Sequence, residues 1–178
     1  MPQVMTDTGP CRVFIGLGGN LGEPLARFRQ ARQQWAEHPR IDLVASSPLY
    51  RTAPVGGPAG QPDYLNAVVE LVTGLSPLSL LSLCLVQEQE SGRVRTERWG
   101  ARTLDLDLLF YGQQIASLPH MTVPHPRCHQ RLFVLQPLCD LAPEFTHPVL
   151  GRTVAELLRD LSAAGAASGD VVLLQHDW

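Results

Sequence analysis

The apolar positions in the first third of the chain predict a strand, a helix and a second strand. Residues 12–18 are mostly apolar and end at glycine and asparagine, as in a buried strand followed by a turn. From Leu25 to Trp35, apolar residues recur every three or four positions, which predicts a helix. Residues 41–52 are rich in β-branched and aromatic residues but contain a proline, which predicts an edge strand. The glycine- and proline-rich residues 55–63 predict a loop.

The middle of the chain repeats this alternation. Residues 65–73 alternate and are β-branched, which predicts a strand paired with the preceding one. Ser76 followed by Pro77 is typical of a helix start, and Gly92 of a helix end. Residues 103–112 alternate strongly enough to predict another strand.

The predicted order, βαββαβ, favours an α+β fold. It matches a ferredoxin-like core, in which an antiparallel sheet carries helices packed on one face. We expect C-terminal additions to this core: loops around residues 119–126, helices at 132–141 and 154–164, and a last strand at 171–175.

Length and composition predict one domain. A chain of 178 residues, 44% apolar and 17% charged, can bury a sizeable core without disulfides. We expect a single domain at 11–178 after a loose N-terminal extension at 1–10, which lacks the basic start and apolar stretch of a signal peptide. No apolar run approaches the length of a bilayer span, so we expect a cytoplasmic protein without membrane partners.

The charged residues exclude several classes of protein. A net charge of -3 argues against a protein that mainly binds nucleic acid. All 14 basic residues are arginine. A Schiff-base enzyme and a P-loop nucleotide enzyme both require a lysine, so neither can be built from this sequence.

Glycines, cysteines and histidines give weaker signals. The segment beginning at Gly16 has Leu21 where a dinucleotide-binding fingerprint needs glycine, so we expect only a turn that brings backbone close to an active site. The spacing of the four cysteines predicts free thiols rather than a zinc site. His125 and His129 lie four residues apart, which leaves a zinc hydrolase as an alternative, but no HExxH motif surrounds them.

Two carboxylates carry the first chemical signal. Asp105 and Asp107 lie two apart on a predicted strand, so both point to one face, roughly 7 Å apart. Carboxylate oxygens in this number suit Mg²⁺, which takes further ligands from water and substrate phosphates. The alternative is an ordinary solvated sheet face.

The preceding segment is rich in arginine. Arg93, Arg95, Arg98 and Arg102 surround an indole, Trp99. Guanidinium groups bind phosphate oxygens bidentately, so a polyphosphate with Mg²⁺ explains both signs of charge. Two alternatives remain: a surface network of ion pairs, and a ferredoxin-like RNA-binding module in which Tyr64 and Phe133 stack on bases.

Four blocks of sequence carry a resemblance to a known family. They are FIGLGGNLG, SPLYRTAPVGGPAGQPDYLNAVVEL, GRVRTERWGARTLDLDLLFYG and TVPHPRCHQRLFVLQPLCDLAP. With these blocks the chain resembles the 6-hydroxymethyl-7,8-dihydropterin pyrophosphokinases from Val13 to about Val154. The resemblance implies an ATP-dependent enzyme of folate biosynthesis that moves the diphosphate of ATP onto the hydroxymethyl group of a reduced pterin and releases AMP.

The resemblance also implies roles for individual residues. Asp105 and Asp107 would hold two Mg²⁺ ions and, with Arg93 and Arg102, form the catalytic set. The implied ATP-binding residues are Glu88, Arg93, Arg95, Arg98, Trp99, Arg102, Leu108, Thr122, His125 and Arg131. The implied pterin-binding residues are Thr52, Pro54, Val55, Tyr64, Asn66, Trp99, Asp105 and Phe133. Residues 93–101 would form a loop that closes over the substrates. The oligomeric state stays open.

The sequence departs from the family pattern at a few positions. Ala101 stands where proline is usual before the arginine, and Val55 stands where leucine is common. The stretch between Arg95 and Trp99 is also one residue shorter than in some members, so the role of Arg98 follows less directly than that of Arg102.

Overall fold

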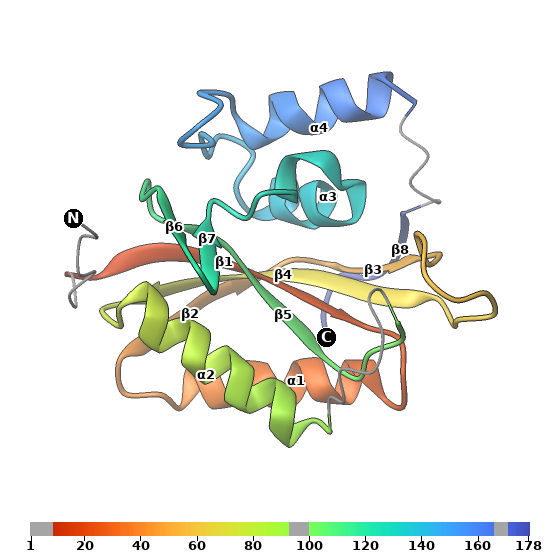
Figure 1. Cartoon of the computed structure of the whole chain (residues 1–178), viewed down its shortest axis with the longest axis horizontal. Coiled ribbons are helices and arrows are strands. Elements are labelled where there is room, and N and C mark those ends of the chain that lie inside the picture. Colours follow the sequence, from red (N-terminus) through yellow and green to blue (C-terminus); the bar gives the residue numbers. More distant parts are fainter. Residues whose placement is uncertain (1–8, 93–99, 166–170) are drawn as a thin grey trace.

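The computed structural model describes residues 9–92, 100–165 and 171–178 (Figure 1). The strands are β1 (Cys11–Gly19), β2 (Ile41–Ser46), β3 (Leu49–Thr52), β4 (Tyr64–Thr73), β5 (Asp105–Tyr111), β6 (Ala116–Leu118), β7 (Met121–Val123) and β8 (Val172–Gln175). The helices are α1 (Pro24–Ala36), α2 (Pro77–Glu90), the 3₁₀ helix η1 (Cys128–Gln130), α3 (Leu132–Leu141) and α4 (Val154–Ala163).

The main sheet is antiparallel and confirms the predicted α+β core. Its strand order is β5-β1-β4-β3-β8, and β2 also pairs with β4. The central strand β1 pairs with β4 on one side and β5 on the other. Strands that are distant in sequence are therefore adjacent at the middle of the sheet.

The predicted edge strand at residues 41–52 is two strands separated by Ser47 and Pro48. Ser47 bridges the break: its N–H donates to Val68 O at 2.8 Å, and its Oγ accepts from Val68 N at 2.9 Å. The prediction of an edge is wrong for the second half, because β3 pairs with both β4 and β8. Proline is tolerated here because it lies at the break and not within a ladder.

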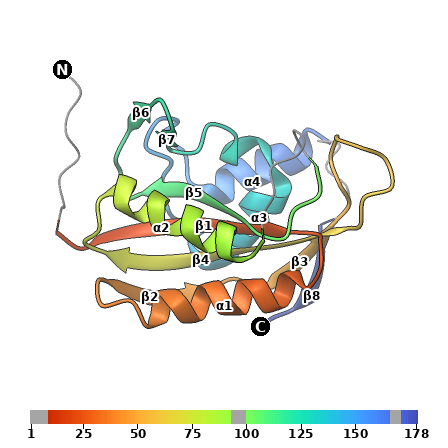
Figure 2. The same cartoon turned by 60° about the horizontal axis from the view of Figure 1, so that its bottom comes forward.

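Helices cover both faces of the sheet (Figures 1 and 2). α1 and α2 lie on one face, as predicted for the core, and bury Trp35, Phe28 and Leu80 against it. α3 and α4, the predicted C-terminal additions, lie on the other face, where Leu135 and Leu157 join a second apolar cluster. Each face of the sheet thus has its own apolar core.

Two features near β5 were not predicted. A bulge shifts the register between Phe14 and Ile15, so consecutive residues Leu109 and Phe110 both join the cluster beneath α3. β6 and β7 form a small hairpin where only loops were expected. These strands have three residues each, too few to show periodicity. Within the described residues, no helix is long and apolar enough to cross a membrane.

Candidate active site

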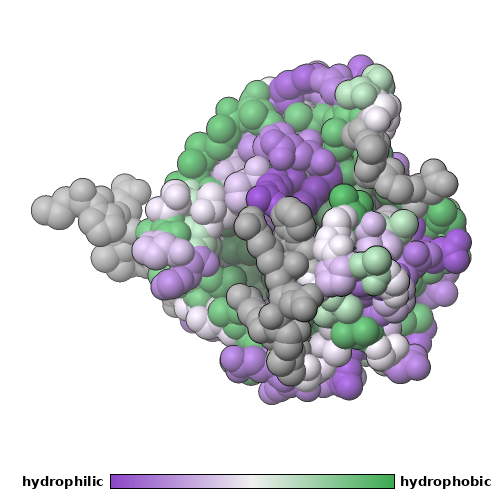
Figure 3. Space-filling view, turned by 45° about the vertical axis from the view of Figure 1, so that its right-hand side comes forward, coloured by the Kyte–Doolittle hydropathy of each residue, from purple (hydrophilic) through white to green (hydrophobic). Residues whose placement is uncertain are grey.

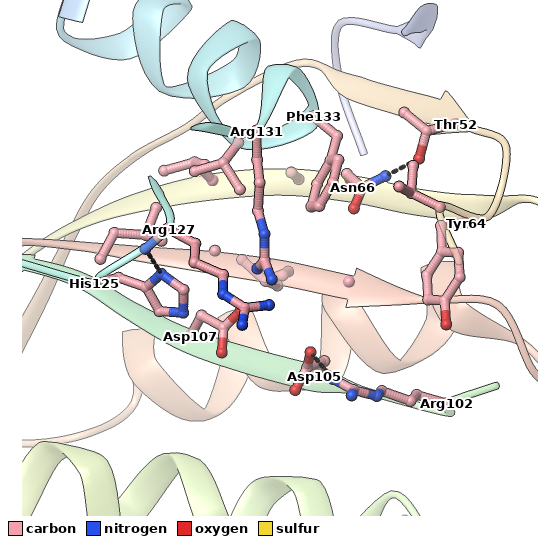
Figure 4. Close-up of a pocket in the computed structure, with 18 of the residues that line it drawn as sticks. Thr52, Tyr64, Asn66, Arg102, Asp105, Asp107, His125, Arg127, Arg131 and Phe133 are labelled. Carbon is pink, nitrogen blue, oxygen red and sulfur yellow. Dashed lines mark hydrogen bonds and ion pairs between the residues drawn. The ribbon is translucent and has the colours of Figure 1, made fainter. Parts of the chain in front are cut away.

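A cavity of about 610 Å³ lies on the α3 face of the sheet. β1, β4 and β5 form one wall, and the segment from His125 to Val134 faces them (Figure 4). Figure 3 turns the right-hand side of Figure 1 forward and shows a hydrophilic patch beside a recess in the surface. The predicted site residues that line the cavity are Thr52, Val55, Tyr64, Asn66, Arg102, Asp105, Asp107, His125, Arg131 and Phe133.

Glycines of the central strand form the middle of this wall. Gly18 pairs with Asn66 of β4 and with Asp105 of β5, and Gly16 pairs with Asp107. A Cβ on Gly18 would lie 3.6 Å from Asn66 Oδ1. Gly16 and Gly18 lie within the strand predicted at residues 12–18, and the chain bends at Leu21 and Gly22 directly after it. The missing side chains of the strand glycines leave room between the carboxylates and the amide.

Asp105 and Asp107 both face the cavity, while Leu106 and Leu108 point into the core beneath α1 and α2. Arg102 forms an ion pair with Asp105. Burial and the charge of Asp105 raise the pKa of Asp107 to about 7, because the opposing effect of Arg131 is smaller. Two close carboxylates, one of them deeply buried, are an arrangement that a cation stabilises.

Two arginines and a histidine gather around Asp107 in the cavity (Figure 4). The side chains of Arg131, Arg127 and His125 lie next to one another there, and of the three His125 lies farthest from Tyr64 (Figure 4). Burial, together with the charges of Arg131 and Arg127, lowers the pKa of His125 to about 4. The Nδ1 atom of His125 accepts the backbone N–H of Arg127 at 3.1 Å. His125 is therefore a neutral ring that carries its proton on Nε2, as a hydrogen-bond donor.

The opposite end of the cavity combines aromatic rings with a buried amide. Asn66 Nδ2 donates to Thr52 Oγ1 at 2.7 Å, which fixes the amide plane. Tyr64 OH donates to Gly100 O at 3.1 Å. Phe133 lies on the facing wall, and the guanidinium carbon of Arg131 is 5.6 Å from the centre of the Phe133 ring. This end offers ring faces and a directional polar group, as a flat heterocycle requires.

Asn20 connects three segments around the cavity. Its Oδ1 accepts from Arg102 N at 2.8 Å, and its own N–H donates to Arg102 O at 2.8 Å. Its Nδ2 donates to Pro62 O at 3.0 Å and to Gln61 Oε1 at 3.3 Å. Since Asn20 is 5% exposed, these bonds hold Arg102 and the start of β4 in fixed relation.

Some predicted residues lie elsewhere. The Glu88 carboxylate is buried beneath the sheet and accepts from Leu106 N at 2.8 Å, so it positions β5 from behind. The Leu108 side chain belongs to the same core, and Thr122 is exposed on β7. Pro54 is half-buried next to the cavity-lining Ala53 and Val55. Arg93, Arg95, Arg98 and Trp99 lie outside the described residues.

Comparison with known proteins gives this cavity a context. The profile of the 7,8-dihydro-6-hydroxymethylpterin-pyrophosphokinase (HPPK) family matches residues 14–143. The chain belongs to this family. A 2-amino-4-hydroxy-6-hydroxymethyldihydropteridine pyrophosphokinase of Pseudomonas aeruginosa is 48% identical over 147 residues, which cover 83% of this chain and 90% of the relative. The protein of that name from Synechocystis is 42% identical over 147 residues, covering 83% and 74%.

Solved structures show the same fold at low sequence identity. The HPPK-DHPS protein of Plasmodium falciparum, solved with pterin and p-hydroxybenzoate, aligns at a TM-score of 0.66 and 16% identity. The alignment covers 87% of this chain but 44% of that one, so the chain spans less than half of the Plasmodium protein. A triple mutant of that protein aligns at a TM-score of 0.70 and 14% identity over 92% of this chain and 45% of that one.

Family membership confirms the predicted class of activity. The enzyme is a pterin pyrophosphokinase of folate biosynthesis, acting on small-molecule substrates with ATP as the donor. The RNA-binding alternative gains no support from these relatives.

The zinc alternative gains no support from the histidines. His125 lines the cavity, but His129 faces Cys128 and His147, with donor atoms within 4.8 Å of one another. His147 Nδ1 accepts from Val149 N at 3.2 Å and from a second backbone N–H at 3.3 Å. The neutral ring therefore carries its proton on Nε2, which has no lone pair left for a metal.

Several cavity residues were not predicted. Arg127 and Gln130 enter from the turn around η1, and Leu109 enters because of the bulge in β5. Arg127 lies two residues after His125, but this spacing alone does not show that both side chains enter the cavity, because that depends on the turn between them. Gly16 and Gly18 lie within the strand predicted at residues 12–18, but their place in the cavity wall was not predicted.

Proposed function

We propose that the cavity holds the two substrates end to end, the reduced pterin between Tyr64 and Phe133 and the ATP phosphates between Asp107 and Arg131. The observation that carries this proposal is the position of the β5 carboxylates between an aromatic end and a cationic end of one cavity (Figure 4). The reaction moves the terminal diphosphate of ATP to the pterin hydroxymethyl group and leaves AMP.

Asp105 and Asp107 would hold two Mg²⁺ ions. The donor set fits, since both side chains offer oxygen. Burial and the charge of Asp105 disfavour the ionised form of Asp107, as its raised pKa of about 7 shows, and a bound cation would stabilise that form. Mg²⁺ supplies neutralisation of the charge on the phosphate oxygens when it is bound. Arg102 contributes by holding the Asp105 carboxylate through their ion pair.

Asn66 would orient the pterin. Because Nδ2 is engaged with Thr52, Oδ1 of Asn66 is turned toward Gly18 and the cavity. An oxygen in this position accepts from an N–H group on the edge of an aminopyrimidinone. Tyr64 and Phe133 would cover the ring faces, with about 1–3 kcal/mol from each stacking contact. Backbone around Thr52 and Val55 would close that edge.

The transfer itself would depend on position and charge. In our proposal the hydroxymethyl oxygen attacks the β-phosphorus in line, from the pterin end of the cavity, and its proton is released to water. The bond between the β-phosphorus and the α-phosphate oxygen breaks on the far side, and AMP leaves with the electron pair. Arg131 and the Nε2 proton of His125 would contact phosphate oxygens, where charge-assisted hydrogen bonds are strong. No covalent intermediate on the protein is required, and positioning with charge stabilisation supplies the rate.

The experiment that tests the proposed function follows AMP release. The protein is mixed with ATP, Mg²⁺ and 6-hydroxymethyl-7,8-dihydropterin, with a parallel reaction that lacks the pterin. We expect AMP to form only when the pterin is present, and none when EDTA removes the metal. AMP formed at the same rate without pterin would contradict the proposal, because the cavity would then be catalysing hydrolysis.

A further inference from the structure

Arg127 is an exposed residue at the N-terminal end of η1, and the sequence analysis gave it no role. It lines the cavity with His125 and Arg131, and Figure 4 shows its guanidinium extending toward Asp107 between those two residues. Its guanidinium is therefore directed into the site, although its backbone lies at the surface.

The backbone of Arg127 is held firmly. Its N–H donates to His125 Nδ1 at 3.1 Å, and its carbonyl accepts from Gln130 N at 3.1 Å. The next residue, Cys128, is fully buried and its N–H donates to His125 O at 3.2 Å. Because the backbone of this turn is fixed by hydrogen bonds, the direction in which the Arg127 side chain starts is also fixed. Binding residues are commonly supported by rigid backbone in this way.

The charges around Arg127 favour an anion. Burial lowers the pKa of His125 most, and the positive charges of Arg131 and Arg127 lower it further. Burial also lowers the pKa of Arg131; the charge of Asp107 opposes this shift and that of Arg127 adds to it. Arg102 is engaged with Asp105 at the other end of β5. Asp107 supplies one negative charge beside the guanidinium groups of Arg127 and Arg131 (Figure 4), and a phosphate of higher negative charge would be favoured between them.

The position of Arg127 indicates which part of the nucleotide this group is. Tyr64, Asn66 and Thr52 lie at one end of the cavity, and His125 and Arg127, which reaches Asp107, lie at the other, with Asp105 between (Figure 4). In an in-line transfer the attacking and leaving oxygens lie on opposite sides of the phosphorus. The leaving α-phosphate therefore falls on the side of Arg127.

We propose that Arg127 is a further phosphate-binding residue, which contacts the α-phosphate and stabilises the charge that develops on the leaving AMP. This inference rests on the proposed function. The guanidinium forms charge-assisted hydrogen bonds to phosphate oxygens beside the Nε2 proton of His125. No proton moves in this contact, and the bond that breaks is the one between the β-phosphorus and the α-phosphate oxygen.

The test compares Arg127→Gln with Arg29→Gln. Gln keeps a polar side chain but removes the positive charge. Arg29 is the control because it is an exposed arginine on α1, on the other face of the sheet. We expect R127Q to lower kcat/KM for ATP by about 10- to 100-fold and to weaken binding of Mg²⁺-ATP measured by calorimetry. The KM for the pterin and the melting temperature should match those of R29Q.

The outcomes separate this inference from the proposed function. If R127Q retains the kcat/KM for ATP of R29Q, Arg127 is not a phosphate contact. If R127Q raises the KM for pterin as much as that for ATP and melts at a lower temperature, the arginine only holds the turn, which also overturns the inference. If the unmodified protein forms no pterin-dependent AMP, the proposed function itself fails. R127K, which keeps the charge without the fork, should recover part of the lost kcat/KM.

Discussion

At the scale of single residues, the carboxylates of β5 set the chemistry. Replacing Asp107 with Asn keeps its shape but removes the charge that would hold the metal. We expect transfer to fall on the order of 10³-fold, since metal stabilisation of transition-state charge is worth several kcal/mol. The assay is pterin-dependent AMP release. D42N is the matched control, because Asp42 is exposed on β2 away from the cavity; full activity in D107N would remove Asp107 from the metal site.

The raised pKa of Asp107 predicts a pH dependence. Its pKa of about 7, against an ordinary 3.8, means that the folded protein keeps a proton that the unfolded chain loses between these values. Ionisation of Asp107 therefore lowers the stability of the metal-free protein as pH rises toward 7. A metal requires the ionised form, so Mg²⁺ competes with this proton at lower pH.

We expect the gain in melting temperature on adding Mg²⁺ with ATP to be larger at pH 8 than at pH 5.5. Differential scanning fluorimetry at both values measures this gain. In D107N the difference between the two pH values should shrink. An equal gain at both pH values in the unmodified protein would show that Asp107 does not exchange a proton for the metal.

The sequence predicted which side chains share one face of a strand better than it predicted their hydrogen-bond partners. The alternation of residues 103–112 placed Asp105 and Asp107 on one face, which the structure confirms. The partner of Glu88, the N–H of Leu106, could not be predicted, because it depends on how α2 crosses β5. The catalytic and binding roles of these residues remain proposals.

At the scale of elements, the end of β1 is packed closely against the segment that carries Arg102. A Cβ on Gly19 would lie 2.8 Å from the backbone oxygen of Thr103 and 3.3 Å from Pro24 Cβ. Backbone cannot yield as a flexible side chain does, so G19A should move residues 100–104 and cost about 1–3 kcal/mol.

We expect G19A to lower the free energy of unfolding in urea and to reduce kcat, because Thr103 adjoins Arg102. G9A is the control, since a Cβ on Gly9 meets nothing within 4 Å. A G19A variant as stable and active as G9A would show that the approach of β1 to Thr103 is not needed.

Most elements were predictable because their patterns are local. The helix at 132–141 has the predicted bounds. The bulge in β5 and the division of the second strand were not predictable, since both depend on pairing with a distant strand. A proline within a strand-like pattern indicates either a break in the strand or an edge strand, and only the pairing of the strands distinguishes the two.

At the scale of the whole molecule, Trp178 joins the C-terminal segment to the core. It is 9% exposed, its Nε1–H donates to Ser47 O at 2.7 Å, and its ring packs edge-on against Phe28. The guanidinium of Arg32 stacks over the ring at 4.5 Å. Its side chain belongs to the core on the face opposite the cavity.

We expect W178A to lose about 3–5 kcal/mol of stability in urea denaturation, from lost packing and the unpaired Ser47 carbonyl. W178F should retain most of the packing and lose less. Both variants should keep the kcat of the unmodified protein at a temperature where they remain folded. Stability unchanged in W178A would contradict the assigned role of this contact.

The central claim is that the cavity brings the pterin hydroxymethyl oxygen to the β-phosphorus of ATP. The most direct measurement uses pterin labelled with ¹⁸O in its hydroxymethyl group, with the products analysed by mass spectrometry. The account predicts that the label stays in a pterin that has gained a diphosphate, while AMP is unlabelled. Label in AMP, or formation of ADP with a pterin monophosphate, would contradict it.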